Sequence, residues 1–166
     1  MNKQRLLILD RERIDRKLQR MAYQIWEENS NEKAITLVGI EESGMAVAKS
    51  LVERLRKISP LNIDLISLKL NKKKLLNEDI KIAEDLNGRT VILVDDVANS
   101  GKTLLYGLRP LMNYELKKIM IAVLIDRKHK SYPITPDIIG QSVSTTLLEH
   151  IEVVTEGDDI TAAYLQ

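Results

Sequence analysis

The chain has 166 residues, of which 44% are hydrophobic, so it can bury a full core without disulfides, and we expect a single domain over 1–166. The 25 Lys and Arg nearly balance the 24 Asp and Glu, so the chain lacks the overall basic excess of a dedicated nucleic-acid binder. The absence of cysteine excludes disulfides, thiolate zinc sites and cysteine nucleophiles. No apolar run approaches the roughly 20 residues of a spanning helix, so we expect a cytoplasmic protein without membrane contact.

Amphipathic helices alternate with short apolar strands along most of the chain. Hydrophobic residues recur at helical spacing from Ile14 to Trp26, and Asp10 stands where the N-cap of that helix is expected. In chain order, the pattern predicts a helix over 14–26, a strand over 34–40, a helix over 46–58, strands over 63–70 and 90–94, a helix over 103–112 and a strand over 119–125. Continuously apolar strands between helices are typical of parallel strands covered on both faces. We therefore expect an α/β, doubly wound, mostly parallel sheet flanked by helices, with one or two late strands between 150 and 164.

The segment that follows the strand at 90–94 carries the most chemistry. It reads Asp95-Asp96-Val97-Ala98-Asn99-Ser100-Gly101-Lys102-Thr103. In open α/β sheets, ligands bind outside the carboxyl ends of the strands, where this segment falls. Two adjacent acids at the end of a buried strand need partners, and small residues at a helix start offer backbone N–H groups to a phosphate. This combination describes a ribose-phosphate site, and the alternative is a capped strand end with no ligand.

Three other motifs do not match this segment. A nucleotide P-loop needs glycine five residues before Gly101, where Asp96 stands. A phosphoreceiver domain carries its acid pair after the first strand, whereas this pair lies past the middle of the chain. The seven glycines contain no G-x-G-x-x-G, so the dinucleotide-binding fingerprint is absent.

The run from Val91 to Thr103 resembles the phosphoribosyl pyrophosphate-binding motif of the type I phosphoribosyltransferases. The likeness extends over nearly the whole chain to the bacterial pyrimidine-operon attenuator/uracil phosphoribosyltransferases, through Ser43-Gly44 and the segments 122–130 and 133–140. It implies a type I phosphoribosyltransferase-like fold with a small hood. It also implies Mg²⁺-dependent transfer of ribose 5-phosphate from phosphoribosyl pyrophosphate to a nucleobase, in a homodimer.

The resemblance further implies roles for individual residues. Asp95 and Asp96 would hold the ribose hydroxyls, directly or through Mg²⁺, and the turn at Ser43 and Gly44 would lie against the pyrophosphate. The residues expected around the 5′-phosphate are Ala98, Asn99, Ser100, Gly101, Lys102 and Thr103. The lysine-rich stretch over 71–87 would be a flap that closes the site. The residues expected in the hood over the base are Arg127, His129, Ile138 and Ile139, within the segments 126–130 and 138–139.

Two departures from the resembled family bear on function. Purine-salvage members place a carboxylate where Asn99 stands, and because asparagine is no base at pH 7, this position favours a pyrimidine such as uracil, or no base chemistry at all. The resembled proteins have Thr-Arg-Gly in the pyrophosphate turn, where this chain has Glu42-Ser43-Gly44. A cation is therefore missing beside a strongly anionic leaving group.

Two other functions remain open at this point. Residues 1–20 hold seven basic and three acidic residues, which permits an RNA-binding regulator that uses the pocket to sense nucleotides. The missing arginine motivates the other alternative, a domain that binds a phosphorylated sugar without turnover.

Overall fold

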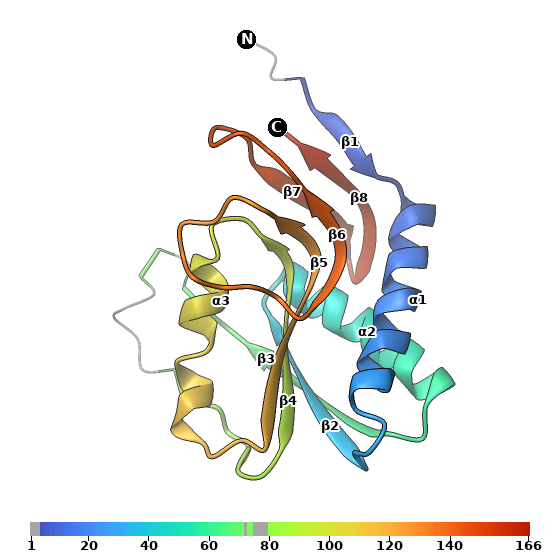
Figure 1. Cartoon of the computed structure of the whole chain (residues 1–166), viewed down its shortest axis with the longest axis vertical. Helices are drawn as coiled ribbons and strands as arrows, with labels where there is room; N and C mark the ends of the chain where they lie inside the picture. Colours follow the sequence, from blue (N-terminus) through green and yellow to red (C-terminus); the bar gives the residue numbers. More distant parts are fainter. Residues whose placement is uncertain (1–3, 72, 75–79) are drawn as a thin grey trace.

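A five-stranded parallel sheet forms the centre of the computed structural model, which describes residues 4–71, 73–74 and 80–166 (Figure 1). The strand order is β3-β2-β4-β5-β6. The strands are β2 (Ala34–Ile40), β3 (Asn62–Leu68), β4 (Thr90–Ala98), β5 (Lys118–Arg127) and β6 (Ile138–Val143). The doubly wound parallel sheet predicted from the alternation of helices and apolar strands is confirmed.

Helices cover both faces of this sheet. On one face lie α1 (Arg11–Glu28) and α2 (Ser43–Ile58), and on the other α3 (Lys102–Gly107) with the 3-10 turn η1 (Pro110–Asn113) (Figure 1). Asp10 caps α1 as predicted, because its carboxylate accepts a hydrogen bond of 2.8 Å from the N–H of Arg13. The sheet thus separates two layers of core. The α1 and α2 layer includes the fully buried Ile14, Met21, Ile25, Leu51 and Leu55, and the α3 layer includes Leu93, Leu104 and Leu111.

Two predicted boundaries near the acid pair are wrong. β4 continues to Ala98, four residues beyond the predicted end, so Asp95 and Asp96 lie within the strand and not in a turn after it. The helix predicted over 103–112 ends at Gly107, because Pro110 has no N–H to continue the hydrogen-bond ladder. The 98–103 loop therefore leads into a helix of only six residues, whose dipole is correspondingly small.

A second sheet stands beyond the carboxyl ends of the central strands (Figure 1), and we call it the hood. It is antiparallel, in the order β1-β8-β7, and comprises β1 (Leu6–Leu9), β7 (Ile151–Glu156) and β8 (Asp159–Leu165). The two late strands are as predicted, but the strand at the N-terminus was not. A short apolar run carries little local signal until its partner strand is known.

The hood does not include the residues expected to form it. Ile138 and Ile139 lie in β6 of the central sheet, where they pair with Ala122 and Val123, and the side chain of Ile138 is fully buried. Ile138 and Ile139 therefore lie outside the antiparallel hood sheet, and a contact of 126–130 and 138–139 with a base stays a prediction. From the sequence, these two isoleucines could have contacted a base. Their parallel pairing with β5 places Ile138 in the core and packs Ile139 against it.

The predicted flap lies partly outside the described residues, because 72 and 75–79 are not described. Its two ends are anchored, since Leu70 and Leu86 are buried in the core layer beside α3. None of the helices in the described part of the chain is long and apolar enough to cross a membrane.

Candidate functional site

A cavity of about 480 Å³ lies between the carboxyl end of β4 and the beginning of β7. The acid pair and the loop that follows it form one wall. The opposite wall is formed by His150 and the first three residues of β7. Ser43, the first residue of α2, also lines the cavity. The lining residues are Ser43, Asp95, Asp96, Val97, Ala98, Asn99, Ser100, Gly101, Thr103, Leu104, His150, Ile151, Glu152 and Val153.

The acid pair is held by the backbone that follows it. Asp95 is only 2% exposed, and one of its carboxylate oxygens accepts a hydrogen bond of 2.9 Å from the N–H of Asp96. Asp96 is half-buried and accepts a bond of 2.7 Å from the N–H of Val97. These two bonds to the following backbone N–H groups fix the orientation of both carboxylates at the end of β4.

Gly44 brings the start of α2 against this acid pair. A Cβ atom at Gly44 would lie 2.8 Å from the Oδ1 atom of Asp95 and 2.9 Å from the carbonyl oxygen of Val94. Any side chain at position 44 would therefore push α2 away from β4. The glycine lies outside the cavity lining, but it sets the distance between Ser43 and the carboxylates.

A left-handed glycine and three hydrogen bonds fix the shape of the 98–103 loop. Gly101 has φ +84°, a left-handed conformation that favours glycine. The carbonyl oxygen of Ser100 is occupied by the N–H groups of Ser131 and Tyr132, at 3.1 Å each. The Ser100 hydroxyl accepts a bond of 3.2 Å from the N–H of Lys102. A phosphate group would find backbone N–H donors and the hydroxyls of this loop on one side of the cavity.

Eight of the predicted site residues meet at this cavity: Ser43, Asp95, Asp96, Ala98, Asn99, Ser100, Gly101 and Thr103. Six do not line it: Gly44, Lys102, Arg127, His129, Ile138 and Ile139. Lys102 is exposed, with its ammonium group 5.9 Å from the ring centroid of Tyr106. The Arg127 guanidinium donates to the carbonyl oxygens of His129, at 3.2 Å, and Glu149. Those contacts are to backbone and leave Arg127 beside the hood.

The residues from His150 to Val153 line the cavity and were not predicted. The sequence indicated a late strand here, but it held no sign of which central strand the hood would face. Glu152 forms an ion pair with Arg5 of the neighbouring N-terminal segment, whose guanidinium lies 4.6 Å from the ring centroid of Tyr164. The approach of these distant segments is visible only in three dimensions.

The charge of the cavity is negative. Its described lining contains three carboxylates, Asp95, Asp96 and Glu152, and no lysine or arginine. Among the described residues, no group of three or more His, Cys, Asp or Glu side chains could by itself hold a metal ion. One or two carboxylates fit Mg²⁺, which commonly keeps several waters and binds through substrate phosphates as well. The residues present therefore suit a cation that arrives with an anionic ligand.

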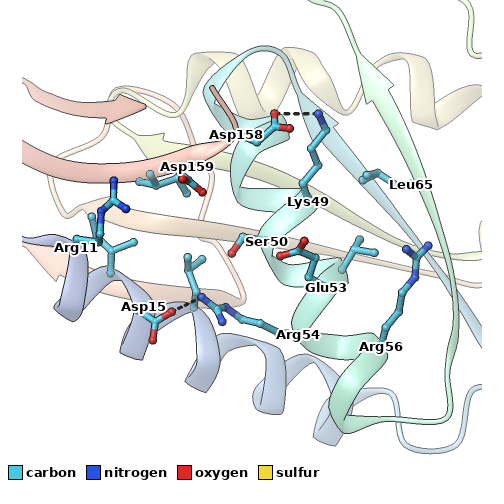
Figure 2. Close-up of a pocket in the computed structure, with 14 residues that line it drawn as sticks. Arg11, Asp15, Lys49, Ser50, Glu53, Arg54, Arg56, Leu65, Asp158 and Asp159 are labelled. Atoms are coloured by element: carbon cyan, nitrogen blue, oxygen red, sulfur yellow. Dashed lines mark hydrogen bonds and ion pairs between the residues drawn. The ribbon is translucent and has the colours of Figure 1, made fainter. Parts of the chain in front are cut away.

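A second hollow, of about 410 Å³, lies between α1, α2 and the turn that joins β7 to β8 (Figure 2). Its charged lining consists of Arg11, Lys49, Arg54 and Arg56 against Asp15, Glu53, Asp158 and Asp159. Lys49 pairs with Asp158 at 2.9 Å and Arg54 with Asp15 at 2.5 Å. The first of these pairs attaches the hood to α2 and the second joins α2 to α1. Because both pairs connect elements of the fold, we take the first cavity as the candidate functional site.

Known proteins agree with this geometry. Residues 6–156 match the sequence profile of the family described as "Phosphoribosyl transferase domain". The "Bifunctional protein PyrR" of Macrococcus caseolyticus is 34% identical over 96% of this chain and 98% of its own length, and "Bifunctional protein PyrR 1" of Lactiplantibacillus plantarum is 34% identical over 92% and 91%. The hypoxanthine phosphoribosyltransferase structure of Trypanosoma cruzi shares the fold, with a TM-score of 0.77 over 94% of each chain at 13% identity. The chain belongs to the phosphoribosyl transferase domain family, in its type I branch.

Proposed function

We propose that this chain transfers ribose 5-phosphate from phosphoribosyl pyrophosphate to a pyrimidine base, with uracil as the first candidate acceptor. The observation that carries the proposal is the meeting of Asp95, Asp96, the 98–103 loop and Ser43 around one cavity. Two carboxylates suit a ribose, the loop suits its 5′-phosphate, and the Ser43 hydroxyl at the first residue of α2 suits the pyrophosphate.

In this proposal the protein contributes position and electrostatics. Asp95 and Asp96 orient the ribose hydroxyls, and the 98–103 loop holds the 5′-phosphate. The C1–pyrophosphate bond breaks as the bond between C1 and the base nitrogen forms, and the proton of that nitrogen passes to the departing pyrophosphate. The nearby carboxylates stabilise the positive charge on the sugar. Bound Mg²⁺ would neutralise charge on the departing pyrophosphate. The wall from His150 to Val153 excludes water from the reacting carbon.

The acceptor follows from position 99. Asn99 lines the cavity beside the phosphate loop, but its carboxamide has no basic group at neutral pH. A base that needs no proton acceptor at this position is therefore preferred over a purine that needs one.

The direct test incubates the protein with phosphoribosyl pyrophosphate, Mg²⁺ and each common base, and separates the products by chromatography. We expect uridine monophosphate from uracil. Absence of product with every base at high protein concentration would contradict the proposal. Calorimetry with phosphoribosyl pyrophosphate and Mg²⁺ then separates a domain that binds without turnover from one that does not bind.

A second candidate function, an RNA-binding regulator, is favoured by a different surface. A groove between α1, β1 and β6 is lined by Arg13, Arg16, Lys17 and Arg20, with no acidic residue among its described lining. Arg16 pairs with Glu12, and Arg20 donates to the carbonyl oxygens of residues 139 and 140, at 2.7 and 2.6 Å. Arg13 and Lys17 are the side chains that remain to contact phosphates.

This candidate is tested by fluorescence anisotropy with a pyrimidine-leader RNA over a range of salt concentrations. The double variant Arg13→Gln/Lys17→Gln is expected to weaken binding and to reduce the slope of log K against log salt by about 1.4, since each phosphate contact to a single strand contributes about 0.7. Lys57→Gln, at the exposed end of α2, serves as the control. An affinity that is insensitive to salt would refute a phosphate-contact mode.

A further inference from the structure

The free edge of the hood faces the phosphate loop. β7 is an edge strand, hydrogen-bonded to β8 on one side only. His150 and Gln166 exchange two backbone hydrogen bonds, of 2.9 and 3.0 Å, across this pair. Since hydrogen-bonded and non-hydrogen-bonded pairs alternate along antiparallel strands, the N–H and C=O groups of the next residue, Ile151, point away from β8.

Asn99 occupies both of these backbone groups. Its Nδ2 atom donates to the carbonyl oxygen of Ile151 at 3.2 Å, and its Oδ1 atom accepts from the N–H of Ile151 at 3.3 Å. The carboxamide thus stands in for a neighbouring strand at one position. The Ile151 side chain is 1% exposed, so its outward backbone groups would be costly to leave without partners.

Arg127 fastens the same stretch from the adjacent central strand. Its guanidinium donates to the carbonyl oxygen of Glu149, two residues before Ile151, and also to that of His129. Side chains at the ends of β4 and β5 therefore hold alternate backbone carbonyls at the beginning of β7. The stretch that they hold leads into the wall formed by 150–153, which lies across the cavity from the acid pair.

We propose that Asn99 is a positioning residue that couples the 98–103 loop to the wall formed by 150–153. The coupling rests on the proposed function, in which the loop holds the 5′-phosphate and the wall encloses the base. Occupation of the loop fixes the Asn99 backbone, and the carboxamide transmits that order to the edge of β7. Binding of phosphoribosyl pyrophosphate at the loop is therefore expected to order the 150–153 wall beyond its ligand-free state.

The test is amide hydrogen exchange followed by NMR, on the full chain with and without phosphoribosyl pyrophosphate and Mg²⁺. In the absence of ligand, Asn99→Ala is expected to accelerate exchange of the Ile151 amide roughly five- to tenfold, the effect of losing a net hydrogen bond of about 1 kcal/mol. The matched control is Asn87→Ala, which removes an Asn side chain that accepts from the N–H of Glu115 at 2.8 Å, far from the cavity. The control should leave the Ile151 amide unchanged.

The ligand arm tests the coupling. In the wild type, phosphoribosyl pyrophosphate should slow exchange both in 98–103 and in 150–153, whereas in Asn99→Ala only the first segment should respond. In turnover, the variant should raise the KM of the base roughly tenfold with much less change in kcat, the signature of a lost binding geometry. Arg127→Met should also accelerate exchange at the beginning of β7.

Two results would overturn the inference. One is an Ile151 amide whose exchange does not respond to Asn99→Ala, and the other is ligand protection of 150–153 that persists undiminished in that variant. Failure of the proposed function is separate and recognisable, because phosphoribosyl pyrophosphate would then protect neither segment of the wild type. The exchange of the ligand-free variants would still decide whether Asn99 holds β7.

Discussion

In the proposed function, Ser43 is the side chain of α2 that faces the pyrophosphate. Ser43 lines the cavity at the first residue of α2, and the described lining contributes carboxylates but no lysine or arginine. Two residues earlier, the Glu41 carboxylate accepts a hydrogen bond from the Ser67 hydroxyl of β3. A neutral hydroxyl therefore stands where the resembled proteins have a guanidinium.

Restoring that guanidinium should tighten binding. We expect Ser43→Arg to increase the affinity for phosphoribosyl pyrophosphate in the presence of Mg²⁺ by about tenfold, because a charge-assisted hydrogen bond contributes about 1.5–3 kcal/mol before the cost of ordering the side chain. Isothermal titration calorimetry measures the change. Ser50→Arg, on the same helix but in the second hollow, is the control, and equal affinities for both variants would contradict the expectation.

Glu149 makes the turn before β7 sensitive to acid. The N–H of Thr146 donates to its carboxylate at 2.6 Å, and this backbone bond, with the Thr146 side chain and the charge of Arg127, lowers the pKa of Glu149 below its usual 4.5. Because the folded pKa is lowered, this stabilisation is present above the unfolded value and is lost as the pH falls through the folded one.

The expected result is a turn that loosens below roughly pH 4.5, the usual range for glutamate. Below roughly pH 4.5, the NMR resonance of the Thr146 amide should shift, and the amide should lose protection from hydrogen exchange. In Glu149→Gln the acid-dependent change should disappear. A Thr146 amide that titrates identically in both proteins would show that another group is responsible.

At the scale of secondary structure, β6 allows α1 to approach the sheet closely. A Cβ atom at Gly140 would lie 2.4 Å from the carbonyl oxygen of Leu124 on β5 and 3.1 Å from the Sδ atom of Met21 on α1. The first contact is with backbone, which cannot rotate away. The glycine in the middle of this strand is therefore a packing requirement between a strand and a helix.

Filling that space should cost stability. We expect Gly140→Ala to lower the free energy of unfolding by about 1–3 kcal/mol, the usual range for overpacking, measured by urea denaturation. Ser142→Ala, two residues along the same strand and exposed, should change it by less than about 0.5 kcal/mol. Equal effects at both positions would indicate that the strand tolerates the added methyl group.

The predictability of the elements followed how local their signals were. α1 and its Asp10 cap were predicted because helical periodicity and capping depend on neighbouring residues. β1 was missed because four residues acquire strand structure only through their pairing with β8, at the other end of the chain. α3 was predicted too long because hydrophobic spacing continued past Pro110, where the backbone could not.

At the scale of the whole molecule, opposite charges are segregated. The net charge of +1 conceals a basic groove on α1, a hollow of mixed charge between the helices and the hood, and a cavity whose charged lining is carboxylate. A polyanionic substrate entering the acidic cavity must carry its own neutralising cation. In the proposed function, the metal would therefore arrive with the ligand.

Removal of Mg²⁺ should therefore affect binding as well as turnover. With a chelator present, the affinity for phosphoribosyl pyrophosphate should fall by at least about tenfold, because carboxylates and phosphates would face each other without a shared cation. The affinity for ribose 5-phosphate, which has no pyrophosphate, should fall much less when the chelator is added. Calorimetry on both ligands provides the comparison, and equal losses would place the metal elsewhere.

Sequence patterns were sufficient for the alternation of helices and buried strands, the acid pair and the small-residue loop, because periodicity, capping and a contiguous motif are properties of neighbouring residues. Eight of the predicted site residues meet at one cavity for that reason. The tertiary structure decided the rest. In that structure Ile138 is buried in the core, and Arg127 donates to the carbonyl oxygen of Glu149 just before β7. The beginning of β7 lies across the cavity from the end of β4. Those outcomes depend on strand register and on contacts between segments 22 to 52 residues apart in the chain, which no local pattern specifies.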